Sequence, residues 1–148
     1  MTTPNLVNDL IRDEGERLQA YKDTVGLWTI GVGHNLDAGG LTDEEKQMIH
    51  DGITHQRAIQ ILQQDINNAV AALDHYQPWW RTLTDRRQDA MVNLCFMGIG
   101  SLNTFTTFLK LMRTGQYDAA AADLLQTKYA SQVHQRANRI ADIIRIGQ

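Results

Sequence analysis

The chain has 148 residues, of which 43% are hydrophobic and 21% are charged, and its formal net charge is −3. This composition is typical of a globular protein and excludes collagen-like, low-complexity and intrinsically disordered classes. The length allows one compact domain, or two small lobes that share a connecting element, but not two independent domains.

The charges are unevenly distributed along the chain. Residues 1–76 carry five Lys/Arg and twelve Asp/Glu side chains, a net −7, whereas residues 77–148 carry nine and five, a net +4. Two differently solvated surfaces would explain this asymmetry, and so would a basic surface that faces an anionic polymer such as a cell wall. We expect no nucleic-acid partner, because the basic residues are spread among apolar positions and match no nucleic-acid motif.

Cysteine and histidine usage gives no sign of redox or metal chemistry. The lone Cys95 cannot form an internal disulfide, and its apolar neighbours predict a buried, unreactive thiol. The five histidines show no paired metal-ligand spacing, so we expect neither a catalytic metal nor a cofactor.

No targeting or membrane-spanning pattern is evident. The first residues lack a basic cluster followed by an apolar run, and no later stretch reaches the roughly 18 apolar residues that span a bilayer. We therefore expect synthesis and folding in a cytoplasm, without stable membrane insertion.

The N-terminal pattern predicts a helix over residues 4–14. Thr3 and Pro4 form an N-cap and first-turn pair, and apolar residues then recur on one face. Glu14 falls on that same face, and Gly15 can end the helix directly after it. The helix therefore presents a carboxyl group on its apolar side.

Residues 18–34 change to glycine, aromatic and β-branched residues, which predicts a short antiparallel hairpin or small sheet. In an extended segment over residues 27–34, alternation places Thr29 and Gly31 on one side and Trp28 and His34 on the other.

Two helices are predicted next. Residues 37–40 form an expected turn, and Thr42-Asp43-Glu44-Glu45 has the spacing of a capping box that opens a short helix ending near Gly52. A longer helix follows from Thr54 to Tyr76, and its about 22 residues would span ~33 Å, enough to connect two lobes.

The remaining residues predict a compact helical lobe, with breaks at residues 98–101, at Gly115 and around residues 130–133. Trp79 and Trp80 could stack on sugars, although two aromatic residues at a helix boundary more often pack in a core. The expected core of this lobe comprises Leu83, Met91, Leu94, Phe105, Phe108, Leu109, Met112, Leu124, Leu125, Ile140 and Ile144.

Taken together, the elements predict an α+β fold that is mostly α, with a small N-terminal antiparallel sheet. The expected N-terminal lobe covers about residues 13–54, the connecting helix about residues 55–76 and the helical C-terminal lobe about residues 77–148, on which the helix over residues 4–14 would pack.

Glu14 and Asp23 suit glycoside hydrolysis, which needs one protonated and one ionised carboxyl group in unlike environments. Desolvation on the apolar helix face favours the neutral form of Glu14, whereas Asp23 lies in a polar turn that suits a charged group. A glutamate that ends a helix and an aspartate in a turn are also common structural choices, so their spacing alone does not decide.

Further motifs accompany this pair, and together they closely resemble the signature of phage-type (T4-like) lysozymes, a family of muramidases that includes many endolysins. The resemblance implies a lysozyme-like, two-lobed fold that forms a single domain over residues 1–148, and cleavage of the β-1,4 bond between N-acetylmuramic acid and N-acetylglucosamine in peptidoglycan. The motifs are Glu14-Gly15, Tyr21-Lys22-Asp23-Thr24, Gly26, Thr29-Ile30-Gly31-Val32-Gly33-His34, Gln64-Asp65, Ala69-Val70, Asn93, Phe96-Met97-Gly98 and Arg136-Ala137.

The resemblance also implies roles for individual residues. Glu14 would be the general acid, Asp23 would activate a water, and Thr29 would help to hold that water in an inverting reaction, although Asp23 as a covalent nucleophile stays open. Candidate substrate-binding residues are Gly31, Leu36, Phe96 and Gly98. The segment over residues 96–101 is shorter than in the T4 relative, and its glycines also suit a plain turn.

Three residues have implied supporting roles. His34 would pair with Asp65 as a supporting ion pair, or would simply be a hydrogen-bonded histidine that fixes a strand to a helix. Arg136 would contact Glu14 and tether the two lobes, or would be a solvated arginine on a charged helix.

Two alternatives to a hydrolase stay open: a lytic transglycosylase, which needs one acid only, and a non-catalytic peptidoglycan-binding module. For the hydrolase we expect a monomer that is held in the host bacterial cytoplasm, is released by a holin-type membrane lesion and acts on the cell wall in the periplasm.

Overall fold

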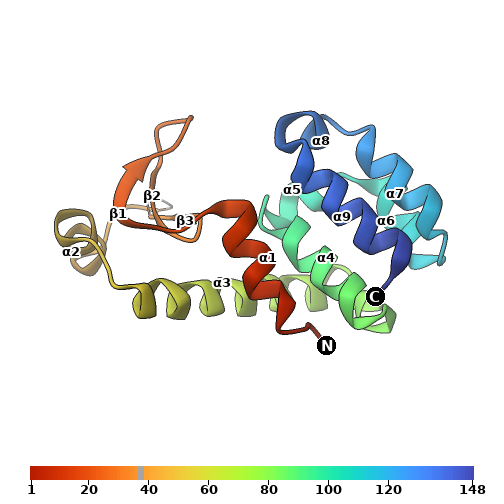
Figure 1. Cartoon of the computed structure of the whole chain (residues 1–148), viewed down its shortest axis with the longest axis horizontal. Coiled ribbons are helices and arrows are strands. Elements are labelled where there is room, and N and C mark those ends of the chain that lie inside the picture. Colours follow the sequence, from red (N-terminus) through yellow and green to blue (C-terminus); the bar gives the residue numbers. More distant parts are fainter. Residues whose placement is uncertain (37–38) are drawn as a thin grey trace. The chain divides into compact units, whose positions relative to one another are not determined.

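The computed structural model describes residues 1–36 and 39–148, which divide into two compact units. One unit comprises residues 1–6 and 68–148, and the other comprises residues 7–67. The divisions fall inside two helices, α1 (Asn5–Glu14) and α3 (His55–Tyr76) (Figure 1). The predicted α+β class is confirmed, since helices predominate and a small antiparallel sheet lies near the N-terminus. The lobe boundaries expected near residues 54 and 76 stay a prediction.

Helix α1 begins and ends as its sequence predicts. The Asn5 N–H donates to the Thr3 hydroxyl oxygen at 3.2 Å, so the Thr3 side chain caps the start of the helix. At the other end, the Gly15 N–H donates to the Ile11 carbonyl oxygen at 2.8 Å, and Gly15 adopts a φ of +73°. The helix therefore stops directly after Glu14.

The sheet has three antiparallel strands in the order β1 (Arg17–Lys22), β2 (Trp28–Gly31) and β3 (His34–Asn35). Thr29 in the central strand lies opposite Tyr21 of β1 and opposite Asn35 of β3. The expectation of one extended strand over residues 27–34 was wrong. Strand β2 ends at Gly31 and a turn follows at residues 32–33, because Gly31 and Gly33 have φ values of +67° and +64° and reverse the chain.

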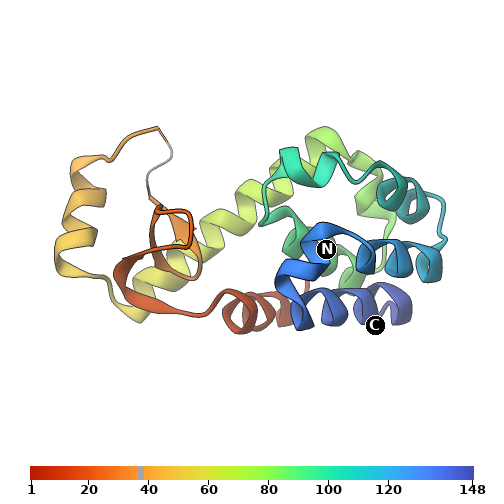
Figure 2. The ribbon, with the colours of Figure 1, turned by 90° about the horizontal axis from the view of Figure 1, so that it is seen from above.

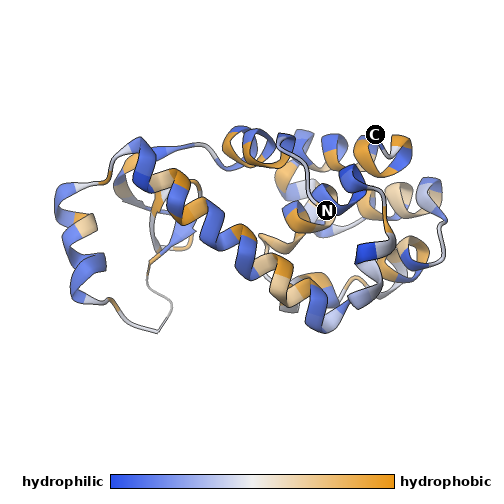
Figure 3. Cartoon of the chain, turned by 90° about the horizontal axis from the view of Figure 1, so that it is seen from below, coloured by the Kyte–Doolittle hydropathy of each residue, from blue (hydrophilic) through white to orange (hydrophobic). Residues whose placement is uncertain are grey.

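Helix α2 (Asp43–Asp51) opens with the predicted capping box. The Glu45 N–H donates to Thr42 Oγ1 and the Thr42 N–H donates to Glu45 Oε1, each at 3.1 Å. The helix ends before Gly52, which has a φ of +76°, and it is largely hydrophilic along its length (Figure 3). The turn expected over residues 37–40 includes Asp37 and Ala38, which lie outside the described residues.

Helix α3 is unbroken over its 22 residues (Figure 2). It starts where predicted, because the Arg57 N–H donates to the Thr54 hydroxyl oxygen at 3.1 Å. In the unit of residues 7–67, its apolar stripe (Figure 3) contributes the buried residues Ala58, Ile61, Leu62 and Ile66.

The other unit is built from a short 3-10 helix and six further α-helices. Helix α7 packs against α6 and α9, and α9 also packs against α4. No described helix is long and apolar enough to cross a membrane. The elements are η1 (Pro78–Thr82), α4 (Asp85–Cys95), α5 (Ile99–Asn103), α6 (Thr106–Arg113), α7 (Tyr117–Leu125), α8 (Lys128–Val133) and α9 (Gln135–Ile146).

Two of the expected breaks in this unit are placed differently. The chain turns at residues 96–98, where Gly98 has a φ of +104°, and helix α5 starts directly after it at Ile99. Residues 130–133 belong to α8, and the break comes at His134, whose φ of +44° separates α8 from α9. The break at Gly115 is confirmed.

The predicted core is confirmed except at Phe105 and Leu125, which are half-buried. Trp80 is fully buried, as expected for core packing, whereas Trp79 is half-buried. Cys95 is buried too, and desolvation raises the pKa of its thiol to about 11, which keeps it protonated and unreactive at neutral pH.

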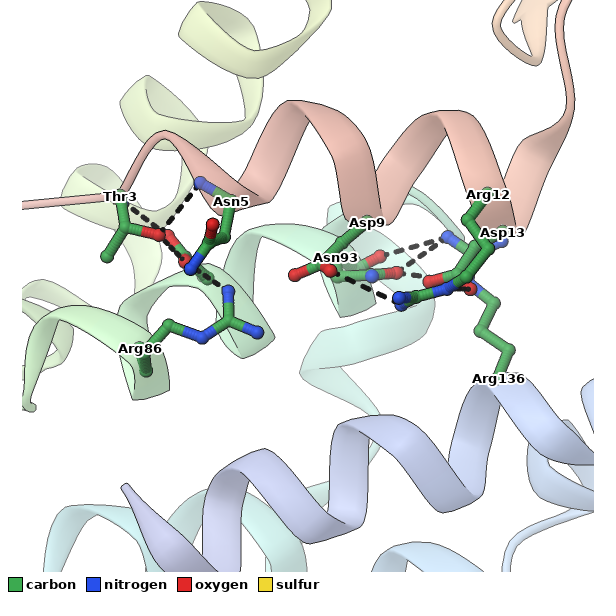
Figure 4. A network of polar contacts seen from close by, with 9 residues as sticks. Thr3, Asn5, Asp9, Arg12, Asp13, Arg86, Asn93 and Arg136 are labelled. Atoms are coloured by element: carbon green, nitrogen blue, oxygen red, sulfur yellow. Dashed lines mark hydrogen bonds and ion pairs between the residues drawn. The ribbon is translucent and has the colours of Figure 1, made fainter. Parts of the chain in front are cut away.

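A buried carboxylate on α4 anchors the N-terminal residues, and two of its partners, Thr3 and Arg86, are labelled in Figure 4. Asp89 is 1% exposed and accepts hydrogen bonds from the Thr3 N–H at 2.7 Å and from the Thr3 hydroxyl at 2.5 Å. The Arg86 guanidinium also donates to Asp89, at 2.6 Å. The charge of Asp89 is thus balanced by Arg86 while its other lone pairs bind Thr3.

We expect Asp89→Ala to lower the free energy of unfolding by about 2–4 kcal/mol, because it removes the buried carboxylate that accepts hydrogen bonds from both Thr3 donors and from Arg86. Urea denaturation monitored by circular dichroism measures the change.

Asp85→Ala is the matched control, since Asp85 pairs with the N-terminal amine at 2.7 Å but its side chain is 62% exposed. Its expected cost is below about 1 kcal/mol. Equal losses in the two variants would show that Asp89 does not anchor the N-terminus.

Candidate active site

Most of the candidate residues belong to the unit of residues 7–67. They are Glu14, Asp23, Thr29, Gly31, His34, Leu36 and Asp65. Arg136, Phe96 and Gly98 belong to the other unit.

Glu14 is the last residue of α1, and its half-buried side chain lies against Gly33. A Cβ atom on Gly33 would stand 2.6 Å from Glu14 Oε2 and 2.9 Å from its Cδ atom, closer than real side chains approach. Gly33 also has a φ of +64°, which favours glycine. Position 33 must therefore lack a side chain for the Glu14 carboxyl group to occupy its place.

Asp23 lies in the turn between β1 and β2, where backbone donors fix its carboxylate. Its Oδ1 atom accepts from the Val25 N–H at 3.0 Å and from the Leu27 N–H at 2.9 Å. The turn is closed by the Asp23 N–H, which donates to the Leu27 carbonyl oxygen at 2.9 Å. Within the described residues no hydrogen bond reaches Oδ2, so that atom is available to a water or a ligand.

Thr29 is 3% exposed and sits in the central strand. Its Oγ1 atom is 3.1 Å from Asn35 Oδ1 and 3.2 Å from the Leu27 carbonyl oxygen, so the hydroxyl donates to one of these acceptors. Its own lone pairs can still accept a hydrogen bond. Asn35 was not among the expected site residues, and only the pairing of β3 with β2, which places it opposite Thr29, could have indicated it.

His34 and Asp65 join β3 to α3. The His34 Nδ1 atom lies 2.7 Å from Asp65 Oδ2, and the two side chains are 30% and 23% exposed. The hydrogen bond to Asp65 is the main cause that raises the pKa of His34, and burial opposes it. The contact links strand β3 to helix α3, and it is an ion pair when His34 is protonated. The supporting role of the pair stays a prediction.

Gly31 and Leu36 are both buried in this unit. A Cβ atom on Gly31 would lie 3.5 Å from Ile53 Cδ1 and 3.6 Å from Ala58 Cβ, so this glycine faces the start of α3. Leu36 lines a pocket of about 620 Å³ together with residues of α2 and α3. Their substrate contacts stay a prediction.

In the other unit, Arg136 holds Asn93. Its guanidinium donates to Asn93 Oδ1 from Nε at 3.0 Å and from a terminal nitrogen at 2.7 Å (Figure 4). Phe96 caps the C-terminal end of α4 and Gly98 caps the start of α5. The contact expected between Arg136 and Glu14, and the substrate contacts of Phe96 and Gly98, stay predictions.

The described residues contain no group of three or more His, Cys, Asp or Glu side chains that could hold a metal ion. In the unit of residues 7–67, Glu14 lies at a helix end and Asp23 lies in a hairpin turn, and their part in the chemistry stays a prediction. These carboxyl groups differ in their surroundings, as acid–base hydrolysis requires.

Comparison with known proteins decides the family. The family profile described as "Phage lysozyme" matches residues 12–140. The chain belongs to the phage lysozyme family. It is also 32% identical over 135 residues to an endolysin of Salmonella phage P22, an alignment that covers 85% of this lysozyme and 82% of that protein.

Two further relatives show the range of proteins in which this sequence type occurs. A probable T4-type lysozyme 1 of Dictyostelium discoideum is 29% identical over 160 residues, which covers 95% of this lysozyme and 94% of the relative. The pre-baseplate central spike protein Gp5 of Enterobacteria phage T4 is 30% identical over 155 residues, which covers 93% of this lysozyme but 27% of the spike protein. Its family identifies this lysozyme as a hydrolase of the glycosidase type.

The His34–Asp65 pair gives a pH-dependent prediction. Because the pKa of His34 is raised in the folded lysozyme, the pair stabilises fully below the ordinary histidine pKa of about 6.5 and loses this contribution as the pH rises through the raised value. We expect Asp65→Asn to cost about 1–3 kcal/mol of unfolding free energy at pH 5.5 and clearly less at pH 8.5, measured by chemical denaturation.

Asp51→Asn is a matched control, because Asp51 pairs with His50 at 2.6 Å on side chains that are 51% and 84% exposed. We expect it to cost below about 1 kcal/mol at both pH values. A cost of Asp65→Asn that does not change between pH 5.5 and 8.5 would contradict the account.

Proposed function

We propose that this lysozyme hydrolyses the β-1,4 bond between N-acetylmuramic acid and N-acetylglucosamine in bacterial peptidoglycan, with inversion, and that it serves host cell lysis as an endolysin. The observation that carries the proposal is the placement of the Glu14 carboxyl group against Gly33, in the unit that also holds Asp23 and Thr29. The similarity to an endolysin of Salmonella phage P22 supports the lytic role.

In the proposed reaction, Glu14 gives its proton to the glycosidic oxygen as the bond from that oxygen to the anomeric carbon breaks. A water attacks the same carbon from the opposite face, and Asp23 takes the proton that the water loses. Backbone N–H groups hold Asp23 Oδ1, which leaves Oδ2 for this water. The hydroxyl oxygen of Thr29 has a lone pair that can accept a hydrogen bond from the same water.

A hydrolytic reaction fits this arrangement better than a lytic transglycosylase reaction. A transglycosylase needs one acid, because the substrate's own hydroxyl group closes the ring. The fixed Asp23 carboxylate and the Thr29 hydroxyl group would have no function in that scheme. A non-catalytic module would likewise need no carboxyl group beside Gly33.

We propose that the protein acts as a monomer on the cell wall in the periplasm, after a membrane lesion has released it from the host cytoplasm. Expression without any pore-forming protein should then leave the cells intact, and adding the lysozyme to outer-membrane-permeabilised cells should clear them.

We expect Glu14→Gln to lower the rate of cell-wall clearing by about 10²–10⁴-fold, because the amide cannot donate the proton to the leaving oxygen. A turbidity assay on permeabilised cells measures the rate, and a thermal melt of the same samples shows that the variant is folded.

Glu16→Gln is the control, since it removes the same charge two residues along the chain from a side chain that pairs with His55 at 2.5 Å. It should clear cells at nearly the wild-type rate. Mass spectrometry of the digest adds a second readout: reducing muramic acid ends support hydrolysis, whereas anhydro sugars as the main product would overturn it. A Glu14→Gln variant that clears cells at the wild-type rate would contradict the assignment of Glu14 as the general acid.

A further inference from the structure

A pocket of about 620 Å³ lies in the unit of residues 7–67, between β3, α2 and α3. We call it the α2–α3 pocket. Three apolar side chains line it: Leu36, Met48 and Ile61. Leu36 and Ile61 are buried and Met48 is half-buried, so part of the pocket surface is apolar.

Among the described residues, four of the eight polar side chains that line the α2–α3 pocket form two ion pairs. Glu44 of α2 pairs with Arg57 of α3 at 3.1 Å, and His34 pairs with Asp65 at 2.7 Å. Arg57 offsets the charge of Glu44, and His34 offsets the charge of Asp65 when it is protonated.

Glu45 is a further acid outside these two ion pairs, and its charge contributes to the raised pKa of His34. Its Oε1 atom accepts the Thr42 N–H at 3.1 Å, and among the described side chains it forms no ion pair within 4.0 Å. The acids of the lining, Glu44, Glu45 and Asp65, therefore outnumber its bases, Arg57 and His34. The pocket keeps a net negative charge beside an apolar surface.

We propose that the α2–α3 pocket binds the aliphatic ammonium side chain of the diamino acid in the stem peptide of peptidoglycan, with Glu45 as its counter-ion. The proposal rests on peptidoglycan as the proposed substrate. The methylene groups would pack on Leu36, Met48 and Ile61, and the ammonium group would lie at the acidic rim.

The negative charge of the pocket favours an ammonium group over other parts of the substrate. An N-acetylated sugar can donate hydrogen bonds to a carboxylate but is neutral and offsets none of its charge, and the C-terminal carboxylate of a stem peptide would be repelled by it. Gln60 and Gln64 also line the pocket from α3, and their amide groups suit the backbone of a peptide next to the ammonium side chain.

The pocket adjoins the site along the chain. His34 lines the pocket, and the preceding residue, Gly33, lies against Glu14. Binding of a stem peptide here would therefore add affinity for strands that carry a free amine without any contact to the reacting atoms.

The test compares Glu45→Gln with Asp43→Asn. A glutamine at the third helical position can still accept the Thr42 N–H, so Glu45→Gln removes the charge and keeps the capping box. Asp43→Asn removes an equal charge from the same helical turn, at a residue that does not line the pocket.

Three soluble substrates are used: uncross-linked glycan strands whose stem peptides carry the free amine, the same strands after N-acetylation of that amine, and strands stripped of peptide by an amidase. We expect the wild type and Asp43→Asn to have a KM about 3–5-fold lower for the amine-bearing strands than for the acetylated ones. Glu45→Gln should lose this preference, and rising salt should weaken it in the wild type.

Cleavage of the peptide-free strands separates the two proposals. If all three proteins cleave them alike, the muramidase is intact and any change in amine preference reports on the pocket. An unchanged preference in Glu45→Gln, or a wild type that does not distinguish acetylated from free amines, would overturn the pocket assignment. Failure of the wild type to cleave any strand would instead contradict the proposed function.

Discussion

The close approach of Gly33 to Glu14 is the constraint on which the arrangement of the candidate site depends. A Cβ atom at position 33 would lie only 2.6 Å from Glu14 Oε2, so the carboxyl group could not keep its place beside a side chain there. The helix end supplies the carboxyl group, and the turn after β2 supplies the space for it.

The same turn organises the neighbouring residues. Because the chain reverses at residues 32–33, β3 returns along β2 and places Asn35 opposite Thr29. His34 then reaches Asp65, which fastens the returning strand to α3. One reversal thus positions the partner of the Thr29 hydroxyl group, the link to α3 and one wall of the α2–α3 pocket.

Local signals in the sequence predicted much of this unit. The end of α1 at Glu14, the capping box of α2 and the start of α3 depend on side chains within three or four residues of the helix end, so short motifs suffice. The turn at residues 32–33 was missed because the glycines were placed in a continuing strand, where alternation gives no sign of a reversal. Asn35 and the Glu14–Gly33 contact depend on pairing between distant residues, which no local pattern contains. The break at His134 was also placed wrongly, since a positive φ at a residue other than glycine has no strong sequence signal.

The most direct measurement compares the activity and stability of Gly33→Ala and Gly115→Ala. Gly115 has a φ of +76° and open space around its Cβ position, so this control carries the backbone strain of alanine without a collision. Both variants should lose about 1–2 kcal/mol of unfolding free energy to that strain, and Gly33→Ala should in addition lose about 10²-fold in kcat/KM on peptidoglycan, because it displaces the Glu14 carboxyl group. A Gly33→Ala variant as active as Gly115→Ala would contradict the account.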